Sequence, residues 1–105
     1  MSFEKELEKG QFCIPECISC NKLIWPPSEF CNLCNRELTL NKSEFEGKII
    51  EFSRQDENYF CIVEFNETVR LIAKMETCPK KNQTVKISKC GISQGSYYFH
   101  IIQNS

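Results

Sequence analysis

Short runs of alternating apolar and polar positions dominate the chain after residue 43. Five runs, each long enough for one strand, are separated by turn residues. They are Glu44–Arg54, Asn58–Phe65, Thr68–Met75, Gln83–Lys89 and Ser96–Ile102. Five antiparallel strands of this length predict a small barrel of the OB type, although an SH3-like barrel or an open sheet would give much the same pattern.

The alternation also predicts which side chains face the interior of the barrel. In the second and third runs, every other position carries an apolar side chain that would line the core. These residues are Tyr59, Cys61, Val63, Phe65, Val69, Leu71, Ala73 and Met75. The first and last runs contain adjacent apolar residues that fit either register. There we place Ile50, Phe52, Tyr97, Phe99 and Ile101 inward.

Several large apolar side chains fall on outward positions of these predicted strands. They are Phe60, Ile62, Ile72 and Tyr98. A lone soluble domain does not need this much exposed apolar surface, so they indicate either a partner or packing against the rest of the chain. Asn66-Glu67 predicts a tight turn between the second and third strands, and Gly47 suits a sharply coiled barrel strand.

The start of the chain predicts a short helix over Phe3–Lys9. Ser2 can cap it, Phe3 and Leu7 share one face, and Gly10 can end it. A helix this short is unstable alone and must dock on the rest of the protein. We therefore expect three parts: an N-terminal helix at 1–10, a ribbon at 11–40 and the barrel at 41–105.

Four cysteines form a repeated motif in the predicted ribbon. Cys17-Ile-Ser-Cys20 and Cys31-Asn-Leu-Cys34 are each followed by Asn and a basic residue. Two such knuckles are typical of one tetrahedral structural zinc site, in which the residue after the second cysteine often needs positive φ. Asn21 and Asn35 tolerate that conformation. Because four sulfurs would leave no open position on the metal, we predict one structural Zn²⁺ and no catalytic residue.

The other cysteines and the single histidine carry weaker indications. Cys13 could replace a ligand but lies outside the repeated knuckle, and Cys61 is expected to be a small buried core residue. We expect Cys78 and Cys90 at the edges of turns, before Pro79 and Gly91. His100 alternates with apolar residues in the last run, which predicts a partly exposed strand residue without a catalytic partner.

Composition limits the choice of partners and compartment. The 105 residues have a formal net charge of −1, unlike the basic domains that bind nucleic acid through phosphate contacts. The chain contains neither an apolar run long enough to cross a membrane nor an N-terminal apolar run typical of a signal peptide. We expect a cytoplasmic protein whose cysteines bind metal, with no membrane partner and nucleic acid disfavoured.

With these motifs identified, the chain resembles, nearly end to end, a family that combines a rubredoxin-like zinc ribbon with an OB fold and was long catalogued as a domain of unknown function. The shared features are a short helix with Phe and Leu, a Gly, two Cys-x-x-Cys motifs with a Pro-Pro pair between them, and a strand containing Gly. Here they are Phe3, Leu7, Gly10, Cys17, Cys20, Trp25-Pro26-Pro27, Cys31, Cys34 and Glu46–Ser53. Ser28 and Asn32 depart from the Arg and Pro common at those positions.

The resemblance implies a non-catalytic accessory subunit that accompanies acyl-CoA enzymes. Archaeal relatives bridge acetoacetyl-CoA thiolase and HMG-CoA synthase of the mevalonate pathway, and bacterial relatives partner steroid-degrading hydratases and aldolases. The resemblance implies a scaffold that assists transfer of CoA intermediates and contacts CoA itself, through residues that the sequence does not identify. We expect contact with the partner at Trp25-Pro26-Pro27 and the neighbouring helix.

Two other functions fit part of the sequence. A single-stranded nucleic-acid module would use the OB barrel, with Phe60, Tyr97 and Tyr98 stacking on bases. A thiol–disulfide enzyme would use one Cys-x-x-Cys, but that motif normally opens a helix and does not come as a matched pair. The pathway served and the stoichiometry of any complex do not follow from the sequence.

Overall fold

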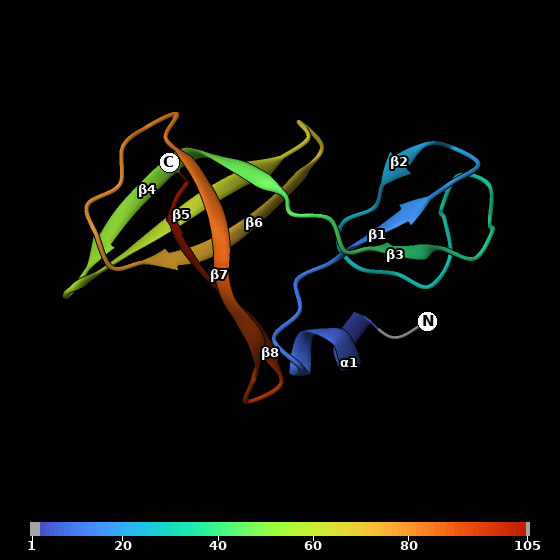
Figure 1. The fold of residues 1–105 in the computed structure, drawn as a ribbon, viewed down its shortest axis with the longest axis horizontal. Coiled ribbons are helices and arrows are strands. Elements are labelled where there is room, and N and C mark those ends of the chain that lie inside the picture. Colours follow the sequence, from blue (N-terminus) through green and yellow to red (C-terminus); the bar gives the residue numbers. More distant parts are fainter. Residues whose placement is uncertain (1–2, 105) are drawn as a thin grey trace.

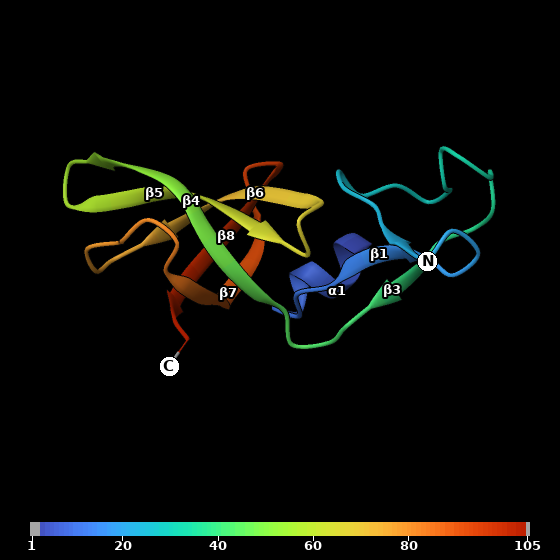
Figure 2. The ribbon, with the colours of Figure 1, turned by 90° about the horizontal axis from the view of Figure 1, so that it is seen from above.

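The computed structural model describes residues 3–104 and separates two β-structures along its longest dimension. A small three-stranded ribbon lies at one end and a five-stranded barrel at the other, with extents of 42 × 28 × 21 Å (Figures 1 and 2). Helix α1 (Phe3–Glu8) lies between them and packs beside strand β7. The predicted mainly β fold is confirmed, and Ser2, the predicted cap, lies outside the described residues.

Helix α1 ends where the sequence predicts. Gly10 has a φ of 83°, its N–H donates to the carbonyl of Leu7, and the Gln11 N–H donates to the carbonyl of Glu6. This pair of hydrogen bonds is the Schellman arrangement that satisfies the last carbonyls of a helix. Phe3 and Leu7 are both buried, so the helix docks through the predicted face.

The ribbon consists of strands β1 (Ile14–Cys17), β2 (Lys22–Leu23) and β3 (Thr39–Asn41) in the order β2-β1-β3. Both pairings are antiparallel. The long excursion between β2 and β3 carries the second cysteine pair, and an isolated bridge between Phe30 and Glu37 closes it at its base. Residue 17, the last of β1, therefore enters the first knuckle directly from a strand.

The barrel contains five strands. They are β4 (Glu46–Gln55), β5 (Asn58–Phe65), β6 (Val69–Met75), β7 (Thr84–Ser93) and β8 (Ser96–Gln103). It closes in the order β4-β5-β6-β8-β7, with β6 and β8 parallel and the other pairs antiparallel. This is the topology of the predicted OB fold.

The inward faces of β5 and β6 are as predicted, but part of β4 and β8 is not. Ile49, not Ile50, is buried, because a bulge at Ile50 shifts the pairing between Ile49 and Glu51. Beyond the bulge Phe52 pairs with Cys61, yet it is 43% exposed because β4 runs past the core. Tyr97 is 39% exposed at the start of β8, whereas Phe99 and Ile101 are buried as predicted.

Strand β7 is longer than predicted. It continues through Cys90 and Gly91, and the turn lies instead at Gln94-Gly95, where both residues have positive φ. Cys90 is therefore a buried strand residue, and its expected place at a turn edge is wrong. Asn66 and Glu67 also have positive φ, which confirms the tight turn between β5 and β6.

One hydrophobic core joins α1, the start of β1 and the barrel. Phe12 makes ring contacts with Phe45, Phe65 and Phe99 at centroid distances of 5.5–5.9 Å. A second, much smaller cluster surrounds Leu38 in the ribbon, and its other buried members are Cys17 and Cys31. Within residues 3–104, none of the helical structure is both long and apolar enough to cross a membrane.

Candidate metal centre

The two knuckles bring four sulfur atoms together at the far end of the ribbon. The Sγ atoms of Cys17, Cys20, Cys31 and Cys34 all lie within 4.8 Å of one another. The Cys17–Cys34 sulfur distance is 3.5 Å and the Cys20–Cys31 distance is 3.8 Å. All four residues predicted from the sequence thus converge on one point that could hold a metal ion.

Local backbone geometry explains how each knuckle turns around this point. Asn21 and Asn35, which follow the second cysteine of each knuckle, have φ values of 56° and 60°. These are the positive values predicted for Asn at this position. The Cys20 N–H donates to the Cys17 sulfur at 3.4 Å, and the Asn35 N–H donates to the Cys31 carbonyl at 2.8 Å. The backbone therefore holds the sulfurs in position as well as supplying hydrogen bonds to them.

Crowding determines how the four thiols ionise. The hydrogen bonds that the Cys20 thiol shares with the other three, led by Cys34, raise the pKa of Cys20 to about 12. Backbone hydrogen bonds from Cys34 and Leu33 lower the pKa of Cys31 to about 6. Because neighbouring thiolates repel one another, four of them can be ionised together only beside a compensating cation.

Zinc fits this arrangement by size and by chemistry. Tetrahedral Zn–S bonds of about 2.3 Å place neighbouring sulfurs about 3.8 Å apart. The shorter sulfur distances, 3.5 and 3.8 Å, already agree with that spacing. A borderline-soft dication suits four thiolates, whereas Mg²⁺ and Ca²⁺ prefer oxygen ligands.

Trp25 connects the ribbon to the rest of the protein. Its ring contacts Phe3 of α1 at 5.6 Å and Phe99 of β8 at 6.1 Å, both edge to face. Trp25 thus packs within the chain and touches all three parts of the fold, while the partner contact expected at Trp25-Pro26-Pro27 stays a prediction. The arrangement of α1 relative to the barrel consequently depends on a residue that follows the first knuckle.

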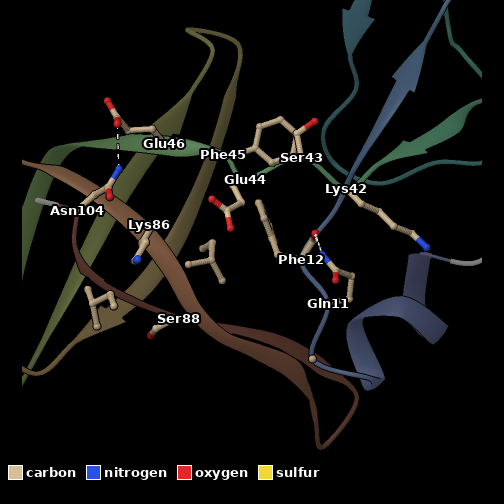
Figure 3. Close-up of a pocket in the computed structure, with 13 residues that line it drawn as sticks. Gln11, Phe12, Lys42, Ser43, Glu44, Phe45, Glu46, Lys86, Ser88 and Asn104 are labelled. Atoms are coloured by element: carbon tan, nitrogen blue, oxygen red, sulfur yellow. Dashed lines mark hydrogen bonds between the residues drawn. The ribbon is translucent and has the colours of Figure 1, made fainter.

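A cleft of about 660 Å³ opens at the waist between ribbon and barrel (Figure 3). Two connecting segments, 10–12 and 42–46, form one side, and β7 with the end of β8 forms the other. Phe12 and Phe45 supply apolar surface, and Glu44 and Lys86 supply charge. No motif in the sequence predicts this cleft, whose sequence indication is a Phe in each of the two connecting segments.

Comparison with known proteins identifies the fold. No protein-family model matches the chain, and no curated protein matches its sequence. A chain in the solved structure described as "Ltp2-ChsH2(DUF35) aldolase" matches with a TM-score of 0.68, covering 93% of this chain and 90% of that one. The fold is DUF35-like. At 14% identity this likeness concerns the fold alone, but it extends over both the ribbon and the barrel.

In this DUF35-like fold the remaining cysteines stay apart from the metal centre. Cys13 and Cys61 are buried, and burial raises the pKa of each to about 11. Burial also raises the pKa of Cys90. Cys78 is exposed in the connection after β6. Cys13 packs in the main core and does not join the four clustered sulfurs.

His100 is partly exposed on the outer side of β8, as predicted. Its ring meets that of Tyr98 at 5.6 Å. Partial burial lowers the pKa of His100, and the nearby charges of Lys74 and Lys89 lower it further. In the part of the chain that the structure describes, neither His100 nor any buried cysteine forms a nucleophile–base pair through a hydrogen bond.

Proposed function

We propose that Cys17, Cys20, Cys31 and Cys34 bind one structural Zn²⁺ and that the chain acts as a non-catalytic accessory subunit of an acyl-CoA enzyme. The convergence of four sulfurs supports the zinc site. With all four positions taken by thiolates, the metal would have no place for water or substrate and would act by holding the fold. The function is then one of binding, carried out by surfaces outside the metal centre.

The single observation that carries the accessory role is the extent of the fold match. It covers helix, ribbon and barrel together, and the matching chain belongs to an aldolase structure. The motif resemblance, from Phe3 to the strand at Gly47, points to the same group of proteins that accompany acyl-CoA enzymes. We propose an acetoacetyl-CoA thiolase or HMG-CoA synthase type of partner, with the chain working in the cytoplasm.

The second part of the proposal is assistance in moving CoA-linked intermediates. The waist cleft supports it, because its volume lies in the range of small-molecule sites. Phe12 and Phe45 would receive apolar parts of a ligand, and Lys86 would pair with a phosphate. Glu44 and Glu46 also line the cleft and would oppose a second phosphate there.

Single-stranded nucleic acid is the weaker alternative. Two of the three aromatic residues it would need are already engaged. Tyr97 packs against Phe3 at 5.4 Å and donates a hydrogen bond to Glu4, and Tyr98 lies over Gly91. A base could stack on these rings only after they moved, and the net charge of −1 adds no attraction for phosphate.

The test is co-purification of the tagged, full-length, zinc-loaded chain from extract of its own cells, followed by mass spectrometry. We expect an acyl-CoA enzyme to be recovered in stoichiometric amount. A Cys17→Ser/Cys34→Ser variant serves as the control for capture by unfolded ribbon. Recovery of a partner that uses no CoA substrate, or of no partner, would contradict the accessory role, and a zinc content well below one ion per chain would contradict the metal site.

A further inference from the structure

Two lysines and a histidine lie side by side on the outer surface of the barrel. Lys74 on β6 pairs with His100 on the parallel strand β8, and Lys89 on β7 pairs with His100 from the other side. Within residues 3–104, neither Lys74 nor Lys89 makes an ion pair. Partial burial lowers the pKa of His100, the charges of Lys74 and Lys89 lower it further, and Glu76 acts in the opposite direction.

Apolar side chains adjoin these cations. Ile72, two residues before Lys74 on the same side of β6, is 66% exposed, and it pairs with Ile62 on β5, which is 37% exposed. Tyr98 stands two residues before His100 on β8. We call Ile72, Lys74, Tyr98, His100 and Lys89 the β6–β8–β7 face. Exposed isoleucines beside unpaired lysines are more typical of an interaction surface than of a solvated strand.

The side chains on this face favour a protein over a nucleic acid. The Tyr98 ring lies on the backbone of Gly91, so closely that a Cβ at residue 91 would come within 2.5 Å of the Tyr98 hydroxyl. One face of the ring is thereby covered, and the ring also makes a T-shaped contact with His100. Of the other apolar groups, Ile62 and Ile72 are aliphatic and offer no platform for a base, which leaves the partly exposed ring of Phe60, paired with Lys74, as a single place for stacking.

We propose that the β6–β8–β7 face docks an acidic segment of the partner enzyme that carries an apolar side chain beside two carboxylates. The apolar side chain would cover Ile72, and the carboxylates would pair with Lys74 and Lys89. Charge complementarity defines the occupant, since the face offers two cations without ion-pair partners within residues 3–104, next to exposed apolar side chains. This inference rests on the proposed function for the identity of the partner, but not for the chemistry of the face.

A partner carboxylate beside His100 would also favour the protonated imidazole. The groups that face His100 are Lys74 on β6, Lys89 on β7 and Glu76 after β6, and the first two oppose protonation in the free protein. Binding would therefore take up a proton and tighten as the pH falls from 8 to 6. Carboxylates of the partner stay ionised over that range, so the dependence would report on the histidine.

The experiment compares Lys74→Glu/Lys89→Glu with Lys80→Glu/Lys81→Glu, which makes the same charge change at two exposed residues of the β6–β7 connection. Each full-length variant is checked for zinc content and circular dichroism and then titrated with the co-purified partner at pH 8 and pH 6. We expect the first variant to weaken binding by about tenfold or more. The second should change it by less than about twofold, and His100→Gln should remove the pH dependence.

The outcomes distinguish failure of the face from failure of the accessory role. If both double variants bind an acyl-CoA enzyme as tightly as the unaltered chain, the face is refuted and the accessory role stands. If the first variant loses a partner that uses no CoA, the face stands and the accessory role fails. If the unaltered chain recovers no protein partner but binds a dT12 oligonucleotide, and only the first variant loses that binding, a single-stranded nucleic acid would replace the acidic segment as the occupant of the face. Recovery of nothing by the unaltered chain would refute both.

Discussion

The number of reactive thiols should rise in two steps, first when the metal is chelated and then when the chain is unfolded by denaturant. With zinc bound, only exposed Cys78 should react quickly with a thiol reagent. A chelator should free the four clustered thiols and raise the count to five. Denaturant should then release Cys13, Cys61 and Cys90, so that all eight cysteines react.

The magnitude of the first step follows from how little apolar core the ribbon has. Leu38 is the only fully buried residue of its cluster that is not a cysteine, and burying one leucine contributes roughly 1.5–3 kcal/mol. A structural zinc ion contributes on the order of 10–16 kcal/mol in small zinc-binding units at neutral pH. Removing the metal should therefore unfold the ribbon, while the barrel keeps a core of its own.

The assay combines thiol counting, zinc release and tryptophan fluorescence. Trp25 is the only Trp and packs between Phe3 and Phe99, so its emission should shift to the red on chelation. With zinc bound, after chelation and after denaturation, Cys78→Ser should have no, four and seven reactive thiols. At the same three stages, Cys61→Ser should have one, five and seven. A count that stays at one after chelation would refute a shared metal, and a count that jumps to eight would refute an independent barrel core.

Two further predictions concern the barrel. Gly47→Ala should lower the free energy of unfolding by about 1–3 kcal/mol in urea, because a Cβ there lies 2.5 Å from Cγ1 of buried Val63. Gly91→Ala should lower the free energy of unfolding by less, since the Tyr98 side chain that the new Cβ would meet can rotate outward. Equal decreases in the two variants would contradict this reasoning. By NMR, His100 should titrate below its ordinary pKa of 6.5. Because the unfolded chain then binds the proton more readily, stability should fall as pH drops through that range, and less so in His100→Gln.

The sequence predicted best where the chemistry of a residue is local. Paired cysteines at a two-residue spacing, and Asn in the position that needs positive φ, identify both knuckles without any knowledge of their neighbours. Gly10 likewise ends α1 by its own backbone conformation. These features require only a few consecutive residues, which a single sequence contains.

Predictions failed where pairing with a distant strand decides the outcome. Ile49 and Ile50 have the same chemistry, and only the bulge against β5 determines which of them is buried. Gly91 resembles a turn residue in sequence, yet it lies in β7 because Tyr98 of the paired strand covers it. Tyr97 fits the inward register but lies past the end of the core. For Ile49 and Gly91 the deciding contact comes from another strand, and Tyr97 instead contacts Phe3 and Glu4 of α1.

Strand β1 is the element through which the metal centre and the barrel affect each other. It begins with Ile14 in the main core, directly after Phe12 and Cys13, and ends with Cys17 in the sulfur cluster. Loss of metal would free one end of this four-residue strand while the other end stayed packed. The waist cleft and Trp25 lie next to that strand and would respond to the metal. The β6–β8–β7 face belongs wholly to the barrel and would not respond to the metal. Partner binding that weakens when zinc is removed would therefore indicate contact at the waist cleft or Trp25, and binding that does not weaken would indicate contact at the β6–β8–β7 face.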